Sequence, residues 1–158
     1  MGLDQPPIQI EFGGEQFLDR VEPLWKQLRE HHANMAPIWR PELLPPDFRP
    51  RREYLLAHCA GGLLVMLACD GSRDVGYCIC SISADRDGEI DSLFVAPTHR
   101  RRGIATRLMT EGLRWLRAQR VKAIFVDVML GNEDPLKLYE RFGFRPRTVR
   151  LKQIGDTT

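Results

Sequence analysis

The chain has 158 residues, of which 43% are hydrophobic and 28% charged, and its formal net charge is +2 at pH 7. These values predict one globular domain over residues 1–158, and they exclude a wholly disordered chain and a strongly basic nucleic-acid-binding protein. No stretch reaches the roughly 18 consecutive apolar residues of a membrane helix, and the first residues show no secretory-leader pattern. We therefore expect a cytoplasmic protein without a membrane or nucleic-acid partner.

The charges are distributed unevenly along the chain. Residues 1–99 have a net charge of −6, and residues 100–158 have a net charge of +8. Such an asymmetry favours an anionic ligand at the positive end. The alternative is that the two halves interleave in space and the asymmetry has no function.

Four cysteines are present, and none belongs to a metal-binding pattern. Cys78 and Cys80 form a C-x-C pair inside an apolar run, and no second pair exists. We expect all four to be reduced core residues, and we expect no metal site.

Hydrophobic periodicity predicts the elements of the N-terminal half. Residues 8–12 alternate as in a short strand, and residues 16–32 have the 3.6-residue spacing of an amphipathic helix. Five prolines between 33 and 50 predict a long irregular loop, which a helix follows over 51–58. Three apolar residues of this loop can either line a substrate pocket or fasten the loop to the core: Met35, Ile38 and Trp39.

The second half contains the other strands. Turns at 70–74 and 85–88 separate three apolar runs and predict three consecutive antiparallel strands. Strands and helices then alternate, which indicates an α+β fold with a mixed sheet. We expect strands over 63–69, 75–83, 89–95, 123–129 and 144–151, and helices over 103–120 and 136–142.

The segment before the helix at 103–120 has the chemistry of a phosphate site. Arg100, Arg101 and Arg102 precede Gly103 at the start of this helix. The first turn of a helix presents unpaired N–H groups and the positive end of the helix dipole, and arginine adds fork-shaped donors. The segment lacks the Lys-Ser/Thr ending of a P-loop and the G-x-G-x-x-G of a dinucleotide fold. A solvated basic turn is the alternative that charge alone leaves open.

Two motifs in this order resemble the GCN5-related N-acetyltransferase (GNAT) superfamily. The first is Arg100-x-x-Gly103-x-Ala105 after a strand that ends in Val-Ala-Pro. The second is Asn132, followed seven residues later by Tyr139 in a Tyr-Glu-x-x-Gly-Phe block. The resemblance implies a GNAT-like, mostly antiparallel sheet of six to seven strands, splayed between the strands at 89–95 and 123–129, with acetyl-CoA bound in the gap as co-substrate.

The resemblance also implies roles for individual residues. The pyrophosphate of acetyl-CoA would bind the first turn of the helix, and the pantetheine arm would pair with the preceding strand in the manner of an added strand. Asn132 would bind the cofactor or hold its loop, and Tyr139 would protonate the departing CoA thiolate, unless it only packs in the core. The other cofactor-binding residues implied are Leu93, Phe94, Val95, Arg100, Arg101, Arg102, Gly103, Ile104, Ala105 and Thr106.

An amine acceptor needs a general base, and Glu89 and Asp91 are the candidates. Alternation places both side chains on one face of the strand that leads into the site. They can equally be solvated charges or groups that bind the amine. We expect Asp127 to have a structural partner and His99 to lie on the surface.

The function expected is transfer of an acetyl group from acetyl-CoA directly to a primary amine of a small molecule or peptide. The acidic N-terminal half favours a cationic acceptor. The alternative is an acyl-CoA-binding sensor or regulatory domain without turnover. The near-neutral charge disfavours a nucleic-acid-binding module, and the sequence leaves a homodimer open.

Overall fold

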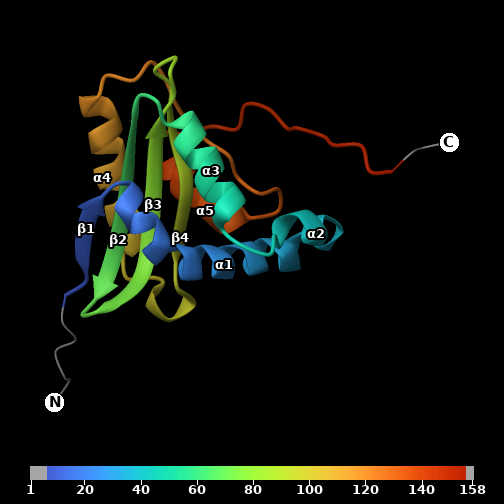
Figure 1. Cartoon of the computed structure of the whole chain (residues 1–158), viewed down its shortest axis with the longest axis horizontal. Helices are drawn as coiled ribbons and strands as arrows, with labels where there is room; N and C mark the ends of the chain where they lie inside the picture. Colours follow the sequence, from blue (N-terminus) through green and yellow to red (C-terminus); the bar gives the residue numbers. More distant parts are fainter. Residues whose placement is uncertain (1–6, 156–158) are drawn as a thin grey trace.

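A computed structural model describes residues 7–155 (Figure 1). It contains one five-stranded sheet in the order β1-β2-β3-β4-β5, in which β4 and β5 are parallel and all other neighbours are antiparallel. The α+β class and the mixed, mostly antiparallel sheet are confirmed. The strands are β1 (Gln9–Gly13), β2 (Gly62–Asp70), β3 (Arg73–Ile82), β4 (Gly88–Val95) and β5 (Ile124–Val126).

Helices cover both faces of the sheet (Figure 1). Because side chains alternate along a strand, β2 sends Val65 and Leu67 towards α1 and α3, and Met66 towards α4 and α5. The central strands are thus buried on both faces, which explains their continuous apolar runs. The helices are α1 (Leu18–Met35), α2 (Arg40–Leu43), α3 (Arg49–His58), α4 (Ile104–Ala118) and α5 (Glu133–Arg141). Within residues 7–155, no helix is long and apolar enough to span a bilayer.

The prediction of six to seven strands is wrong, because the described chain forms five. The segment 144–151 is irregular and extends away from the sheet (Figure 1). Pro146 cannot donate to a strand ladder, and the exposed arginines around it gain nothing from burial in a sheet. The strand expected over 123–129 pairs only through β5.

The proline-rich segment is more regular than expected. It contains a short 3-10 helix, η2 (Pro37–Trp39), then α2, and its last proline lies in the first turn of α3. Pro37, Pro41 and Pro50 each occupy the first or second position of a helix. Proline is tolerated there because those N–H groups have no partner within the helix. These prolines therefore start short helices and do not prevent them.

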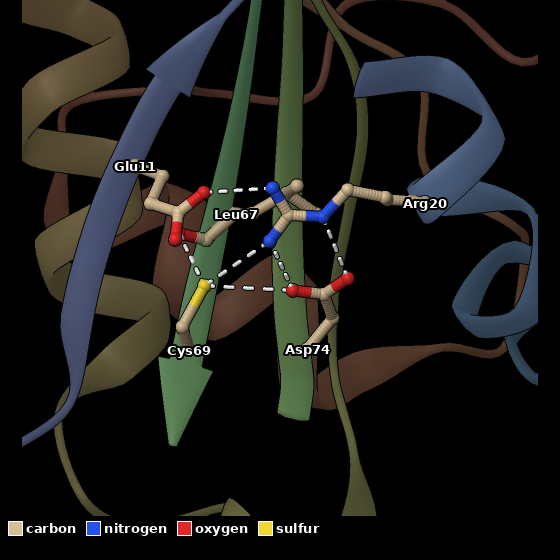
Figure 2. A network of polar contacts seen from close by, with 5 residues as sticks. All are labelled: Glu11, Arg20, Leu67, Cys69 and Asp74. Carbon is tan, nitrogen blue, oxygen red and sulfur yellow. Dashed lines mark hydrogen bonds and ion pairs between the residues drawn. The ribbon is translucent and has the colours of Figure 1, made fainter. Parts of the chain in front are cut away.

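A polar network ties the start of α1 to the edge of the sheet (Figure 2). The Arg20 guanidinium donates to both oxygens of Asp74 on β3, at 2.6 and 3.0 Å, and to Glu11 of β1 at 2.7 Å. The buried Cys69 thiol lies beside them, 3.5 Å from Asp74 Oδ1 and 3.9 Å from the Leu67 carbonyl. Burial and the neighbouring carboxylates raise the pKa of this thiol to about 12, so it stays protonated and unreactive. All four cysteines are free thiols; Cys69, Cys78 and Cys80 are buried as expected, but Cys59 is only half-buried.

We expect Arg20→Met to lower the free energy of unfolding by about 1–2 kcal/mol at pH 7, because Asp74 loses a two-pronged partner that is partly exposed. The hydrogen bond from Arg20 lowers the pKa of Glu11, so the stability due to that contact is present at neutral pH and is lost as pH falls through the lowered value. Urea unfolding at pH 7 and pH 3 measures both effects. A variant that is as stable as the wild type at pH 7 would contradict the prediction.

Candidate active site

A gap opens between β4 and β5 after only three paired positions. Gly88, Glu89 and Ile90 pair with β5, and beyond them no described strand lies against that side of β4. The other side of β4 remains paired with β3 as far as Val95. The edge of β4 from Asp91 to Val95 therefore has backbone groups without a strand partner. The pairing between these two segments, for which a splay is expected, thus ends at Ile90.

A bulge in β4 lies at the start of this gap. Ile79 of β3 pairs with Ser92 and Cys80 pairs with Ile90, so Asp91 has no opposite residue. The Ser92 hydroxyl lies 2.7 Å from the Tyr77 hydroxyl, and Asp91 is hydrogen-bonded to Ser81. Tyr77 and Ser81 share the face of β3 that α1 and α3 cover, because alternate residues lie on one face. The bulge thus places two consecutive β4 side chains, Asp91 and Ser92, on that face.

The phosphate loop, residues 100–103, lies at the other end of the gap and leads into α4. Gly103 has a φ of +72°, and a Cβ atom at this position would meet no other atom within 4 Å. Arg101 also has a positive φ, of +61°. Arg101, Arg102 and Gly103 are exposed, and within residues 7–155 neither arginine has an ion-pair partner. Free guanidinium groups and open N–H groups at a helix start make a site for an anion.

Arg100 differs from the next two arginines. Its Nε donates to the Val95 carbonyl at 3.0 Å, and its guanidinium lies over the Phe94 ring at 5.6 Å from the centroid. Arg100 therefore ties the end of β4 to the phosphate loop. The Val95 carbonyl, expected to pair with pantetheine, already accepts this bond with one of its two lone pairs.

Tyr139 lies on the α4 and α5 side of the sheet. It is 6% exposed and packs edge to face against Phe144, with ring centroids 5.9 Å apart. Burial raises the pKa of its hydroxyl above the ordinary range, and the nearby thiols of Cys78 and Cys80 act in the same direction. No described residue forms a hydrogen bond with this hydroxyl. The packing role foreseen as an alternative is present, and the side chain also keeps a proton that it can donate.

The two candidate bases have different surroundings. Burial raises the pKa of Asp91, and its Oδ2 is buried without a hydrogen-bond partner among residues 7–155. Burial also raises the pKa of Glu89, assisted by the negative charge of Asp91. Both carboxyl groups lie on the same face of β4, as alternation predicts. Asp91 is the better placed, because it sits on the bulge and has a free oxygen.

Arg51 of α3 is a residue that the sequence patterns do not single out. Its Nη2 donates to the Asp91 main-chain carbonyl at 2.9 Å, and its guanidinium lies over the Tyr54 ring. Arg51 and His58 both favour the charged form of Asp91 and of Glu89. A bond across 40 sequence positions leaves no local pattern, so only the folded structure identifies this residue.

Two of the three residues proposed for the acceptor line a groove at the end of α1 and α2. Ile38 and Trp39 line a groove of about 340 Å³ between η2, α2 and residues 152–155. Lys152 closes one side, with its Nζ 2.8 Å from Glu42 and 5.9 Å from the Trp39 ring centroid. Met35, the last residue of α1, is half-buried and does not line this groove. The lining of the groove at Trp39 contains no residue of β4.

The remaining predicted residues have simpler positions. Ile104, the first residue of α4, is buried in the core, Ala105 packs against the same core, and Thr106 lines a shallow groove between α4 and β1. Asn132 caps the start of α5 without a side-chain cap bond, so its amide is available. Asp127 is exposed and forms no ion pair with a described residue, so the expected structural partner is missing. His99 is 6% exposed, so its predicted surface position is wrong.

The comparison with protein families settles the class of this chain. A model of the Acetyltransferase (GNAT) family matches residues 25–144, which include the β4 gap, the phosphate loop and Tyr139. The chain belongs to the GNAT family. This confirms the resemblance.

One curated relative of this GNAT chain is a mycothiol acetyltransferase of Acidimicrobium ferrooxidans. The two are 30% identical over 148 residues, which are 90% of this chain and 44% of the relative. The chain thus spans less than half the length of that protein.

Solved structures share the fold. An aminoglycoside acetyltransferase from an uncultured soil metagenomic sample, in complex with trehalose, has a TM-score of 0.67 at 18% identity, over 94% of this chain and 97% of the other. An aminoglycoside N-acetyltransferase in complex with CoA has a TM-score of 0.64 at 19% identity, over 93% and 100%. A ribosomal-protein-alanine N-acetyltransferase of Brucella melitensis has a TM-score of 0.65 at 19% identity, over 94% and 100%. At these identities the similarity shows the GNAT fold and no particular acceptor.

Proposed function

We propose that this GNAT protein transfers the acetyl group of acetyl-CoA directly to a primary amine. The observation that supports the proposal is the free edge of β4 after Ile90, with the phosphate loop at one end and the Asp91 bulge at the other. One continuous edge can therefore receive an extended anionic ligand and present its far end to a carboxylate.

The residues along this edge are suited to CoA. Its pyrophosphate would lie on the N–H groups that start α4, with Arg101 and Arg102 beside them. Its pantetheine amides would bond the free backbone groups of Leu93 and its neighbours, as an added strand does. Asn132, whose side chain forms no cap bond at the start of α5, would complete the site. When bound, acetyl-CoA supplies an acetyl group activated as a thioester.

Tyr139 and Asp91 have complementary roles in the proposal. The Tyr139 hydroxyl is kept protonated by burial, so it can donate its proton to the departing thiolate. Asp91 has a free carboxylate oxygen on the opposite face, so it can accept a proton from the amine, directly or through water. Glu89, which is half-buried on the same strand, would add negative charge near the incoming amine.

We infer a small polar acceptor that carries a cationic amine. Two half-buried carboxyl groups on one strand favour a positive charge beside them. The mycothiol and aminoglycoside acetyltransferases among the similar proteins are compatible with a small-molecule acceptor, whereas the ribosomal-protein-alanine N-acetyltransferase is named for a protein acceptor. A peptide acceptor would instead need an extended groove that leads to Asp91, and the groove of about 340 Å³ at Trp39 has no β4 residue in its lining.

Calorimetry with CoA and acetyl-CoA, followed by an amine screen with detection of free thiol, tests the function. We expect CoA to bind at a single site and one class of cationic amine to release the thiol. Binding without turnover of any amine would support a sensor domain instead. Absence of CoA binding would refute the proposal.

Asp91→Asn is expected to lower kcat by about 100-fold, the lower end of the range for general base catalysis, with little change in CoA affinity. Burial raises the pKa of Asp91, so the wild-type rate should fall on the acid side at a pH above the ordinary range of aspartate. This acid limb should be missing in Asp91→Asn. Glu89→Gln is the matched control, and we expect it to keep the acid limb and to lose less than about tenfold in kcat. A loss in Glu89→Gln as large as in Asp91→Asn would contradict the choice between them.

A further inference from the structure

His99 is a buried polar residue that the proposed chemistry does not use. Its side chain is 8% exposed, and both ring nitrogens have partners. Nε2 lies 2.9 Å from Asp70 Oδ2, and Nδ1 lies 2.8 Å from the Thr98 hydroxyl. The neutral ring with a proton on Nε2 satisfies both bonds, since it donates to Asp70 and accepts from Thr98. With both nitrogens engaged, His99 has no free site for a proton from substrate.

The position of His99 in the chain is the second observation. It ends the 3-10 helix η3 (Pro97–His99) and directly precedes the phosphate loop. After it come Arg100, which holds the Val95 carbonyl, and then the exposed Arg101 and Arg102. His99 is thus the last buried side chain before the loop, and the next one is Ile104 at the start of α4.

Asp70 connects this residue to a rigid part of the fold. Asp70 ends β2, at the turn that leads into β3 at Arg73. Asp74, just beyond the same turn, is held by Arg20 in the network of Figure 2. The turn therefore has one carboxylate bonded to α1 and another bonded to the residue before the phosphate loop.

We propose that the Asp70–His99 pair positions the phosphate loop for the pyrophosphate of CoA. The loop includes Arg101, a non-glycine residue with left-handed backbone, and such a conformation persists only where its surroundings determine it. The imidazole fixes the point at which the loop leaves η3, and Asp70 fixes the imidazole. His99 and Asp70 are positioning residues, and neither touches the ligand. This inference rests on the proposed function. It assigns part of the protein's affinity for CoA to a pair of residues that lies outside the CoA-binding site.

Calorimetric binding of CoA to Asp70→Ala tests the inference. We expect the Kd for CoA to rise about tenfold, as the loss of a bond to a charged group would produce. In Asp70→Asn the amide oxygen still accepts from Nε2, so CoA affinity should stay within about twofold of wild type. Ligand-observed NMR with pantetheine, which lacks the pyrophosphate, should show equal binding to Asp70→Ala and wild type.

Asp74→Ala is the matched control from the same turn. It removes the Arg20 ion pair, so the melting temperature should fall while the Kd for CoA stays within about twofold. His99→Leu breaks the same pair by removing the other partner. Adding Asp70→Ala to His99→Leu should not raise the Kd for CoA further, because the pair is already broken.

The possible outcomes separate this inference from the proposed function. Wild-type binding of CoA with unchanged affinity in Asp70→Ala and His99→Leu would overturn the inference alone. Equal losses for CoA and pantetheine, or an equal loss in Asp74→Ala, would also overturn it, since the effect would then be general destabilisation. Absence of CoA binding by wild type would overturn the proposed function and this inference together.

Discussion

Gly103→Asp should lower the affinity for CoA by at least about 100-fold while the protein remains folded. The backbone at Gly103 is left-handed, which costs a residue with a Cβ about 1–2 kcal/mol, a loss that most domains survive. Apart from its chain neighbours, no atom lies within 4 Å of the new Cβ, so the side chain starts in open space. It instead extends into the space proposed for the pyrophosphate and adds a negative charge to it. Calorimetry with CoA measures the loss, and circular dichroism confirms the fold.

Gly103→Asn separates charge from backbone strain in this experiment. Asn and Asp have nearly the same shape, and both tolerate left-handed backbone better than other residues. We expect Gly103→Asn to lose less than about tenfold in CoA affinity, and the Asp variant to recover partly as salt rises. Equal losses of CoA affinity in both variants would show that bulk or backbone strain, and not the added charge, weakens binding. Wild-type affinity in Gly103→Asp would place the pyrophosphate elsewhere.

The sequence predicts the central part of the fold well, because its elements have strong local signals. The apolar runs that become β2, β3 and β4 are separated by turns with glycine, and α1 and α4 have clear amphipathic spacing. The segment 144–151 contains apolar residues and is predicted to form a strand, but a strand needs a partner, and none pairs with it among the described residues. The prolines between 33 and 50 predict an irregular loop where the structure has short helices, because a proline that starts a helix cannot be distinguished in the sequence from one that breaks it.

The residues of the candidate site also fall into two groups, those with a local sequence signal and those that only contacts between distant residues identify. The phosphate loop and Tyr139 belong to short motifs, so the sequence alone identifies them. The choice of Asp91 over Glu89 depends on a bulge, and a bulge appears only in the register between two strands. Arg51 and the Asp70–His99 pair depend on contacts over 40 and 29 positions, which a single sequence does not show.

Tyr139→Phe is expected to lower kcat by about 100-fold and to leave the KM for acetyl-CoA within about twofold, as the loss of a general acid would. The hydroxyl forms no hydrogen bond with a described residue, so its removal breaks no contact that stabilises the fold. The melting temperature should therefore be unchanged or slightly higher. Steady-state kinetics with an amine from the screen, together with thermal unfolding, measures these effects.

Tyr77→Phe is the matched control for this variant. Tyr77 is also buried and its pKa is also raised by burial, but its hydroxyl bonds Ser92 at 2.7 Å on the other face of the sheet. We expect Tyr77→Phe to lose stability, by about 1 kcal/mol, and to keep its kcat within about threefold. The two tyrosines thus have opposite signatures, one in rate and one in stability. If Tyr139→Phe instead loses stability and keeps its rate, the hydroxyl has only a packing role, and the thiolate must receive its proton from water.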